Sequence, residues 1–474
     1  MIEMHRQRNL PYLLVIAFLV IIALAPLQQT FSQDKIQNHV VLKIQKGALL
    51  APILSDLDAV AIDTIAGKST FLVYYSDPLP VDSVIDRLEA NPSVIFAQPD
   101  YLCAIPEIGQ ISQSFPDENR PIFINGVSPE LYYDQQGAIL VSADSANLIS
   151  TGVAVTVAVI DNGLKFNHPL FENSISANGY DFVDKDDYPA EEIGGLLGHG
   201  TFVSGIIKRI APGCMIMPLR AFDAEGLGSS FQVAEAIYWA ISNGADVINM
   251  SFSTSEPDPV IFDAINSALE ANPALAASPG NDGQEMATYP SAYAGVIAVS
   301  AIDSLDYLAW FSNYGNYIDV CAPGVNIYSS LAGEYEWGTW SGTSFSAPIV
   351  SGVCALVMSI DPNLNSYSVR NLIKSTAETE LYWGTVTIND PMYGWGRVNA
   401  FAAVWDLVVG DVDMLGGTNV LDVSYLSRFV YRNGPPPKPQ TMRGDVDLSG
   451  SIDTVDINSL IDQIYRNGNG APQN

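Results

Sequence analysis

The chain has 474 residues, 48% of them apolar, which is too long for one ordinary domain and apolar enough for a large core. Asp and Glu number 52 against 21 Lys and Arg, so the formal net charge is −31. Such a charge argues against nucleic acid and anionic membrane surfaces as partners. It suits a protein that works in a salty or calcium-containing medium, and it is equally compatible with a need for solubility alone.

The N-terminus predicts an export signal over residues 1–32. Basic side chains precede an unbroken apolar run over residues 12–25, and small side chains at Thr30 and Ser32 fit cleavage before Gln33. We therefore expect a secreted, extracellular protein. An uncleaved anchor is the alternative, although the run is short for a membrane span. No later segment is expected to be apolar enough to cross a bilayer, so we expect no membrane contact after the signal is removed.

Residues 33–105 predict a small α+β unit. Strands are expected at 39–44 and 69–75, and the apolar residues between Pro80 and Pro92 fall at helical spacing. The next stretch, residues 106–130, is rich in Pro, Asn and other polar side chains. It is typical of an exposed connector in which proteolytic processing is easy.

Strands and helices alternate over residues 131–405. Apolar strands are expected at 153–160, 245–251 and 296–300, and helical spacing covers residues 231–243. This alternation predicts an α/β domain whose mostly parallel sheet is flanked by helices. Sites in open α/β sheets lie beyond the carboxyl ends of strands, and Asp161 directly follows the first of these strands.

Three short runs in this domain carry candidate chemistry, and they contain Asp161, His199 and Ser344 in that order. A serine nucleophile needs a base to take its proton and a buried carboxylate to orient that base. The chain has only four His, which argues against an incidental histidine in a Gly-His-Gly-Thr turn. We therefore predict a catalytic triad. Ser344 also begins a long apolar helix, so its hydroxyl is expected at the positive end of the helix dipole.

Further short motifs accompany the triad in a fixed order along the chain. They occupy residues 249–251, 279–281, 289–291, 311–315, 321–324 and 394–400. Together with the triad they make residues 130–404 resemble the subtilisin-like serine proteases, or subtilases. The resemblance implies a serine endopeptidase that acts on proteins or peptides without a catalytic metal.

The resemblance also implies roles for individual residues. It places Asn281 in the oxyanion hole beside the backbone amide of Ser344, whereas Asn281 taken alone is equally compatible with a turn. Substrate is expected to lie as an extended strand between two edges of the protein. The residues of these edges are Gly226, Leu227 and Gly228 on one side and Ser251, Phe252 and Ser253 on the other.

Three positions depart from the family pattern. Asn162 stands where Thr or Ser usually follows the catalytic Asp, and Phe202 replaces the second His of a His-Gly-Thr-His run. Ser253 replaces a customary Gly beside the primary specificity pocket. None of these changes removes a group that the mechanism needs, but Ser253 leaves the side-chain preference open.

The run over residues 91–101 is similar to the end of the inhibitory propeptide that precedes subtilases. The resemblance implies that residues 33–105 inhibit the enzyme to which they are attached, so that the protein is made as a zymogen. An unrelated α+β domain is the alternative for this unit.

Two other sequence features leave alternatives open. An acidic loop contains Asp181, Asp184, Asp186 and Asp187, and its pattern favours a solvated turn over a calcium loop. The four cysteines are scattered without paired spacing, and two of them lie in apolar surroundings that predict small buried side chains. The sequence leaves one disulfide open.

Two similar segments follow the main domain and begin 34 residues apart. An EF-hand loop takes ligands at positions 1, 3, 5, 7, 9 and 12, with Gly at position 6. The second segment fits every position, whereas the first has Leu415 at position 5. The candidate ligands are Asp445, Asp447, Ser449, Ser451, Asp453 and Asp456 in the second loop and Asp411, Asp413, Asn419 and Asp422 in the first.

These paired loop–helix units, each with Asp at position 12, resemble a type I dockerin over residues 410–468. The resemblance implies an all-α module that is stabilised by structural calcium and can dock to a cohesin module on another protein. A terminal folding or anchoring unit is the alternative.

A rival from another functional class is a non-catalytic binding protein built on a dead protease fold. Loss of a triad residue or of Asn281 would favour that rival, and all four residues are present.

Overall fold

The computed structural model describes residues 34–76, 78–107, 122–123, 130–333, 336–408, 454–459 and 461. The predicted signal, most of the connector and every predicted calcium ligand except Asp456 lie outside the described residues.

Residues 34–107 form an antiparallel sheet with the strand order β2-β3-β1-β4 and two short helices. Sequence patterns predicted β1, β3 and α3 but missed β2, β4 and α2. The bounds are β1 (Lys35–Ile44), α2 (Leu50–Leu54), β2 (Ala59–Ile65), β3 (Thr70–Tyr75), α3 (Val81–Glu89) and β4 (Val94–Ala104).

Strand β1 is buried on both faces because the small sheet has two packing partners. Val40 and Leu42 point into the unit's own core, whereas Val41 joins the core of the main domain. The fifth strand of this sheet is β9 (Leu227–Ser229) of the main domain, which pairs antiparallel with β4. The small unit therefore completes its sheet with a strand that it does not contain.

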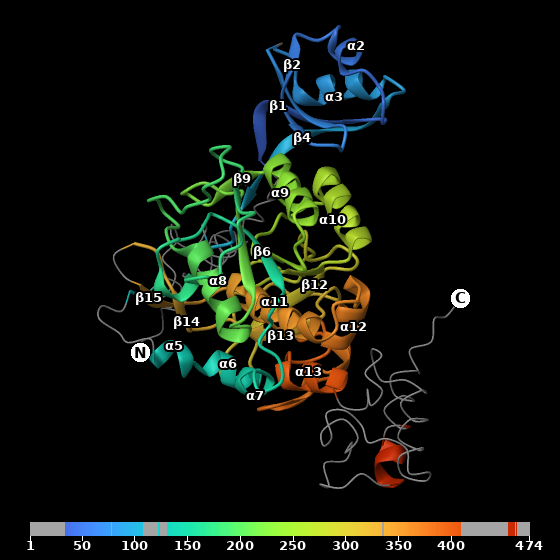
Figure 1. The fold of residues 1–474 in the computed structure, drawn as a ribbon. Coiled ribbons are helices and arrows are strands. Elements are labelled where there is room, and N and C mark those ends of the chain that lie inside the picture. The colour runs from blue at the N-terminus through green and yellow to red at the C-terminus, as the bar shows by residue number, and fades with distance from the viewer. Residues whose placement is uncertain are drawn as a thin grey trace, which may run out of the picture. The chain divides into compact units, whose positions relative to one another are not determined.

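The main domain is built on a seven-stranded sheet with the order β13-β12-β11-β10-β6-β8-β7, in which all neighbouring strands are parallel (Figure 1). This confirms the predicted α/β class. The strands are β6 (Thr156–Asp161), β7 (Tyr180–Asp181), β8 (Met215–Arg220), β10 (Val247–Met250), β11 (Ala274–Ala277), β12 (Ile297–Ile302) and β13 (Val320–Pro323). The longer helices are α8 (His199–Ile210), α9 (Ser230–Ser242), α10 (Pro259–Ala271), α11 (Thr343–Ile360), α12 (Ser366–Ser375) and α13 (Ala400–Val408).

Strand β6 is the point from which the sheet grows in both directions. Its neighbours are β8 on one side and β10 on the other, and both come later in the chain. Open α/β sheets bind ligands beyond the carboxyl ends of strands at such a point. Asp161 is the last residue of β6 and so lies at this edge.

Shorter elements surround the sheet. The connector is not wholly irregular, because its residues Ile122–Phe123 form β5 and pair with β15. The remaining bounds are α5 (Glu130–Tyr133), α6 (Gln136–Leu140), α7 (Ala143–Ala146), the 3₁₀ helix Pro169–Phe171, β14 (Ile327–Ser330), β15 (Trp337–Trp340), β16 (Glu380–Leu381) and β17 (Gly384–Thr385).

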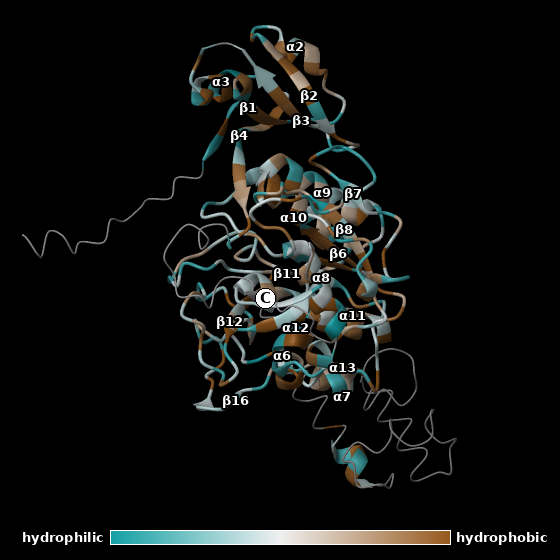
Figure 2. Cartoon of the chain, turned by 90° about the vertical axis from the view of Figure 1, so that its left-hand side faces the viewer, coloured by the Kyte–Doolittle hydropathy of each residue, from teal (hydrophilic) through white to brown (hydrophobic). Residues whose placement is uncertain are grey.

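Helix α11 runs through the core of the main domain. In the described part of the chain it is the one helix that is long and apolar enough for a membrane span, and 89% of its apolar window is buried inside the protein. The expectation that no later segment would be so apolar was therefore wrong, and burial explains the composition. Figure 2 shows apolar residues concentrated on the strands and helices of the interior. The four cysteines are buried and free, so they form no disulfide with one another.

Candidate active site

Asp161 and His199 meet where β6 ends and α8 begins. Asp161 Oδ1 lies 2.8 Å from His199 Nδ1, and both side chains are buried. The sequence suggested a turn around His199, but this residue opens a 12-residue helix. The two flanking glycines explain the motif. Gly198 has a φ of 101°, and a Cβ atom on Gly200 would lie 2.2 Å from the carbonyl oxygen of Gly163.

Asn162 fixes this junction from the strand side. Its side-chain Oδ1 accepts a hydrogen bond from the Gly200 amide (2.9 Å), and its Nδ2 donates to the Leu196 carbonyl (2.8 Å). Its own backbone amide donates to Asp161 Oδ1 at 2.8 Å. The unusual Asn therefore ties the end of β6 to the start of α8, and so helps to set the position of His199.

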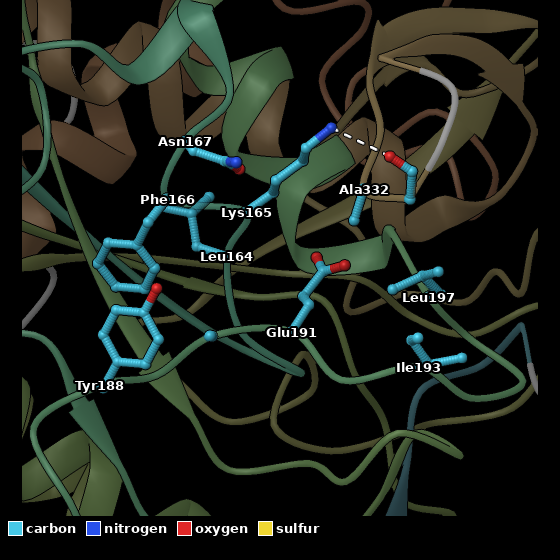
Figure 3. A pocket seen from close by; sticks show the side chains of 11 residues that line it. Leu164, Lys165, Phe166, Asn167, Tyr188, Glu191, Ile193, Leu197 and Ala332 are labelled. Atoms are coloured by element: carbon cyan, nitrogen blue, oxygen red, sulfur yellow. Dashed lines mark hydrogen bonds between the residues drawn. The ribbon is translucent and has the colours of Figure 1, made fainter.

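Glu191 fixes the same junction from the helix side, and the sequence analysis missed it. Its carboxylate accepts hydrogen bonds from the backbone amides of Gly198 and Thr201, which lack partners within α8. Burial raises the pKa of Glu191 to about 7, and nearby Asp161 adds to the rise. Glu191 also lines a cavity of about 460 Å³ whose wall includes Leu197, Phe166 and Tyr188 (Figure 3).

Ser344 lies at the start of α11, as predicted, and is fully buried. Asn281 is anchored beside it, because its Oδ1 accepts hydrogen bonds from the Thr343 amide (2.9 Å) and hydroxyl (2.8 Å). This anchoring turns the Asn281 amide nitrogen toward the centre. The Ser251 hydroxyl donates a hydrogen bond to the Ser344 carbonyl at 2.9 Å, which accounts for the Ser in the 249–251 motif.

The two predicted substrate-binding edges already hold a strand of this same chain. Residue Cys103 pairs with Gly228, and the Ile105 amide donates to the Gly226 carbonyl at 3.1 Å. On the opposite side Ala104 forms an antiparallel bridge with Ser253. The end of the small unit therefore lies as a substrate would be expected to lie.

Glu107 occupies the centre itself. Glu107 falls in the predicted connector, and no sequence pattern indicated a role for it. Its Oε1 accepts a hydrogen bond from Asn281 Nδ2 at 2.9 Å, and its Oε2 accepts one from the Ser344 hydroxyl at 2.9 Å. Oε2 also lies 3.3 Å from His199 Nε2. The structure thus brings the three predicted triad residues and Asn281 together around a buried carboxylate.

The charge of His199 follows from this arrangement. Burial lowers the pKa of its imidazole, but the charges and hydrogen bonds of Asp161 and Glu107 outweigh burial and raise it to about 10. His199 is therefore an imidazolium between two carboxylates. Aromatic rings of Trp340 and Phe345, at centroid distances of 5.6 and 5.5 Å, enclose it.

Ser253 lies beside Gly280, in the region that the resemblance assigns to the primary specificity pocket. A Cβ atom on Gly280 would lie 3.1 Å from Ser253 Oγ, so this hydroxyl faces the 279–281 segment. Phe202, the other noted departure, packs against Phe345 with a centroid distance of 4.7 Å and fills apolar space.

The acidic loop after β7 is closed by a guanidinium. Arg220 is buried and pairs with Asp181 (2.7 Å) and Asp184 (2.6 Å), and its second nitrogen pairs with Glu192 (2.7 Å). The prediction of a merely solvated turn was incomplete, because two of its carboxylates serve this Arg. In the described part of the chain no group of three His, Cys, Asp or Glu is arranged to hold a metal ion.

Asp456 is the one predicted calcium ligand within the described residues. It lies in a helical segment, residues 454–459, and its side chain is buried. The other candidate ligands lie outside the described residues, so the paired calcium loops stay a prediction.

Comparison with known proteins decides the family. Residues 152–396 match the family model Peptidase_S8, described as the subtilase family. The thermophilic serine proteinase of Bacillus sp. (strain AK1) is 34% identical over 338 residues, which cover 68% of this chain and 76% of that one. The M-protease of Shouchella clausii (strain KSM-K16) is 31% identical over 383 residues, which cover 79% and 90%.

The chain belongs to the subtilase family. It is a subtilisin-like serine endopeptidase. The crystal structure of fervidolysin from Fervidobacterium pennivorans, a keratinolytic enzyme related to subtilisin, superposes with a TM-score of 0.66 at 23% identity. That likeness shows the fold alone, and it covers 78% of this subtilase but 61% of fervidolysin.

Proposed function

We propose that this subtilase is a secreted endopeptidase that is made as a zymogen and cleaves peptide bonds through Asp161, His199 and Ser344. The observation that carries the proposal is the gathering of these residues with Asn281 at the start of α11. Each comes from a different element, and their side chains converge on one buried point. Such convergence has no use in a purely structural core.

The mechanism follows from this geometry once Glu107 has left the centre. Ser344 Oγ attacks the scissile carbonyl carbon while His199 Nε2 takes the hydroxyl proton, and Asp161 holds the Nδ1–H and stabilises the imidazolium. Asn281 Nδ2 and the Ser344 amide donate to the oxyanion at the positive end of α11. His199 then gives the proton to the leaving amine, and water hydrolyses the acyl-enzyme by the same steps in reverse.

Substrates are proposed to be proteins or peptides in an extended conformation. Support comes from the antiparallel seating of residues 102–105 between β9 and Ser253. Backbone hydrogen bonds of this kind are independent of side chains, so they suit an enzyme that cuts many sequences. Residues 226–228 and 251–253 are the proposed binding edges.

The propeptide role of residues 33–105 is also part of the proposal. Its support is that β4, which pairs with β9 of the main domain, leads directly into the segment whose Glu107 lies in the active centre. Residues 410–468 are proposed to be a dockerin-like module that binds structural calcium and docks to a cohesin. That part rests on the paired ligand pattern, and calorimetry with calcium on an Asp456→Ala protein would test it.

The experiment that tests catalysis combines an activity assay with covalent labelling. Ser344→Ala should abolish casein hydrolysis and labelling by a serine-reactive phosphonate, with kcat falling by roughly 10⁶, a factor carried over from subtilisin. Ser359→Ala removes a hydroxyl from the far end of the same helix and is the control, with activity unchanged. Activity in Ser344→Ala, or no labelling of the processed wild type, would favour the non-catalytic rival.

A further inference from the structure

Residues 103–107 approach the nucleophile along the substrate path, but they do not present a peptide bond to it. The Ile105 amide and the Ala104 bridge fix the register of the strand against both edges. The chain then reaches Ser344 with Pro106 and Glu107. The contact that this segment makes with the Ser344 hydroxyl is the side chain of Glu107, at 2.9 Å. The same hydroxyl lies farther, at 3.3 Å, from the backbone carbonyl of Ser251 in the domain itself.

The Glu107 carboxylate is buried and fully hydrogen-bonded. Glu107 is 1% exposed, and both of its oxygens accept hydrogen bonds from groups of the catalytic centre. A Cβ atom on Gly342 would lie 2.1 Å from Glu107 Oε1, so in this position the carboxylate lies directly against a residue that has no side chain. A burial this complete and this well partnered indicates a built site for an anion.

Electrostatics explain why a buried carboxylate is stable here. An isolated carboxylate loses several kcal/mol when it leaves water, unless a counter-charge and hydrogen bonds replace its hydration. His199 supplies the counter-charge at 3.3 Å, and Asn281 and Ser344 supply the hydrogen bonds. These donors include the one that would stabilise an oxyanion, so the negative charge of Glu107 lies where the negative charge of a reaction intermediate would form.

All three catalytic functions are consequently blocked by one side chain. The Ser344 proton is directed to Glu107 Oε2, His199 already carries the proton that it must accept, and the Asn281 donor is occupied. We infer that the Glu107 carboxylate is an internal anionic inhibitor of this centre, which locks the unprocessed chain until it withdraws. The inference rests on the proposed function. A propeptide strand provides steric cover, and Glu107 in addition blocks the catalytic groups directly.

The first test follows self-processing of the full-length chain. Glu107→Gln keeps the shape and removes the charge, and Glu107→Ala removes the carboxylate entirely. Both variants should lose the N-terminal unit, and should react with the phosphonate while still unprocessed, roughly tenfold to a hundredfold faster than wild type, because a charge-assisted contact is lost. Asp86→Asn removes one charge from an exposed site in the same unit and should process at the wild-type rate.

The second test does not depend on activity. In a Ser344→Ala background, NMR of the His199 ring should show an imidazolium up to about pH 10. Adding Glu107→Gln should lower that pKa, whereas adding Asp86→Asn should leave it unchanged.

The two tests separate failure of the inference from failure of the proposed function. Equal processing and labelling rates in wild type and Glu107→Gln would overturn the lock, as would an unchanged His199 pKa. If neither protein processes or labels at all, the proposed catalysis is wrong. The NMR comparison still decides whether Glu107 holds the imidazolium, and a misfolded variant would be recognised there by its spectrum.

Discussion

The N-terminal unit, residues 34–107, which contains the proposed propeptide and is called the propeptide below, and the catalytic domain, residues 130–408, differ in how far each depends on the other. The propeptide's own core contains eleven buried apolar side chains in the part of the chain that the structure describes. The catalytic core extends along a fully buried parallel sheet, and it also takes in Val41 and Leu72 from the far face of the propeptide sheet. The propeptide therefore buries one face of its sheet against the catalytic domain, whose core is much larger than its own.

Polar contacts also join the propeptide to the catalytic domain. Asp100 accepts hydrogen bonds from the Ser230 hydroxyl and the Phe231 amide at the start of α9, and Gln98 accepts one from the Val260 amide at the start of α10. Lys185 of the catalytic domain pairs with Asp63 of the propeptide at 2.6 Å. Small cores are marginally stable, so a unit arranged in this way is expected to be held in place mainly by its partner.

Matched leucine truncations give the largest expected difference between the two regions. Leu42 lies in the propeptide core and Leu356 in the catalytic core, and both are fully buried. Each Leu→Ala change should cost about 2–5 kcal/mol of folding free energy. In a Ser344→Ala background, Leu42→Ala should unfold the propeptide and expose it to limited proteolysis, whereas Leu356→Ala should lower the melting temperature of a domain that stays folded.

Val60→Ala is the control for this pair, because Val60 is 56% exposed on β2 and its truncation should cost little. A propeptide that resists proteolysis after Leu42→Ala would contradict the proposed dependence. So would a catalytic domain that unfolds as readily as the propeptide does.

Asn281→Ala tests whether the catalytic domain's own donors carry the chemistry. Loss of one oxyanion donor should lower kcat of the processed enzyme by about 10²–10³, a factor known for subtilisin and carried over from that family. KM should change little, because the interaction forms in the transition state. Steady-state kinetics on a peptide substrate measure both. A rise in KM with kcat unchanged would assign Asn281 to substrate binding instead.

Local sequence signals were sufficient for part of the catalytic domain. Apolar runs predicted three of the seven strands of its sheet, β6, β10 and β12, and helical patterns predicted α9 and α11. These signals are local because a buried parallel strand must be apolar. Three elements of the propeptide, β2, β4 and α2, were missed. Strand β2 alternates at an exposed edge and α2 spans five residues. Strand β4 contains Pro99 and Asp100, which are untypical of strands.

Three charged side chains have roles that no sequence pattern predicted. Glu107, Glu191 and Arg220 have no motif around them. Glu107 meets Ser344 across 237 positions, and Arg220 reaches back to Asp181 across 39, whereas Glu191 contacts the Gly198 amide only 7 positions away. Charged side chains are ordinarily solvated, so only the folded arrangement reveals that these three have such partners.

Asp100 offers a smaller and pH-dependent test of the junction. Burial raises its pKa to about 6, with hydrogen bonds from Phe231, Ser229 and Ser230 opposing the rise, and His39 Nδ1 lies 3.9 Å from it. Because the folded pKa is raised, docking is most favoured below the ordinary pKa near 4 and weakens as pH rises through 6. Melting of Ser344→Ala protein should therefore show a tighter junction at pH 5 than at pH 7.

Two substitutions separate the charge of Asp100 from its capping contacts. Asp100→Ala should weaken the junction by about 1–2 kcal/mol through loss of the helix cap. Asp100→Asn keeps one acceptor oxygen and should remove the change between pH 4 and 6. A junction whose pH dependence survives in Asp100→Asn would assign it to another group, of which His39 is the nearest.

Ser253→Gly probes the point where the propeptide and the proposed specificity pocket share one residue. The backbone amide of Ser253 donates to the Ala104 carbonyl at 3.5 Å, while its hydroxyl faces Gly280. Removing the side chain keeps the backbone contact and widens the pocket by about the size of a hydroxymethyl group. A change of this size shifts discrimination by about 1–3 kcal/mol. The ratio of kcat/KM for a substrate with Phe before the cleaved bond to kcat/KM for one with Ala there should therefore rise about tenfold.

Propeptide processing should stay at the wild-type rate, because residue 104 uses only the backbone. If both substrates change equally, the Ser253 hydroxyl does not line the pocket, and if processing slows as well, its role is to position the strand.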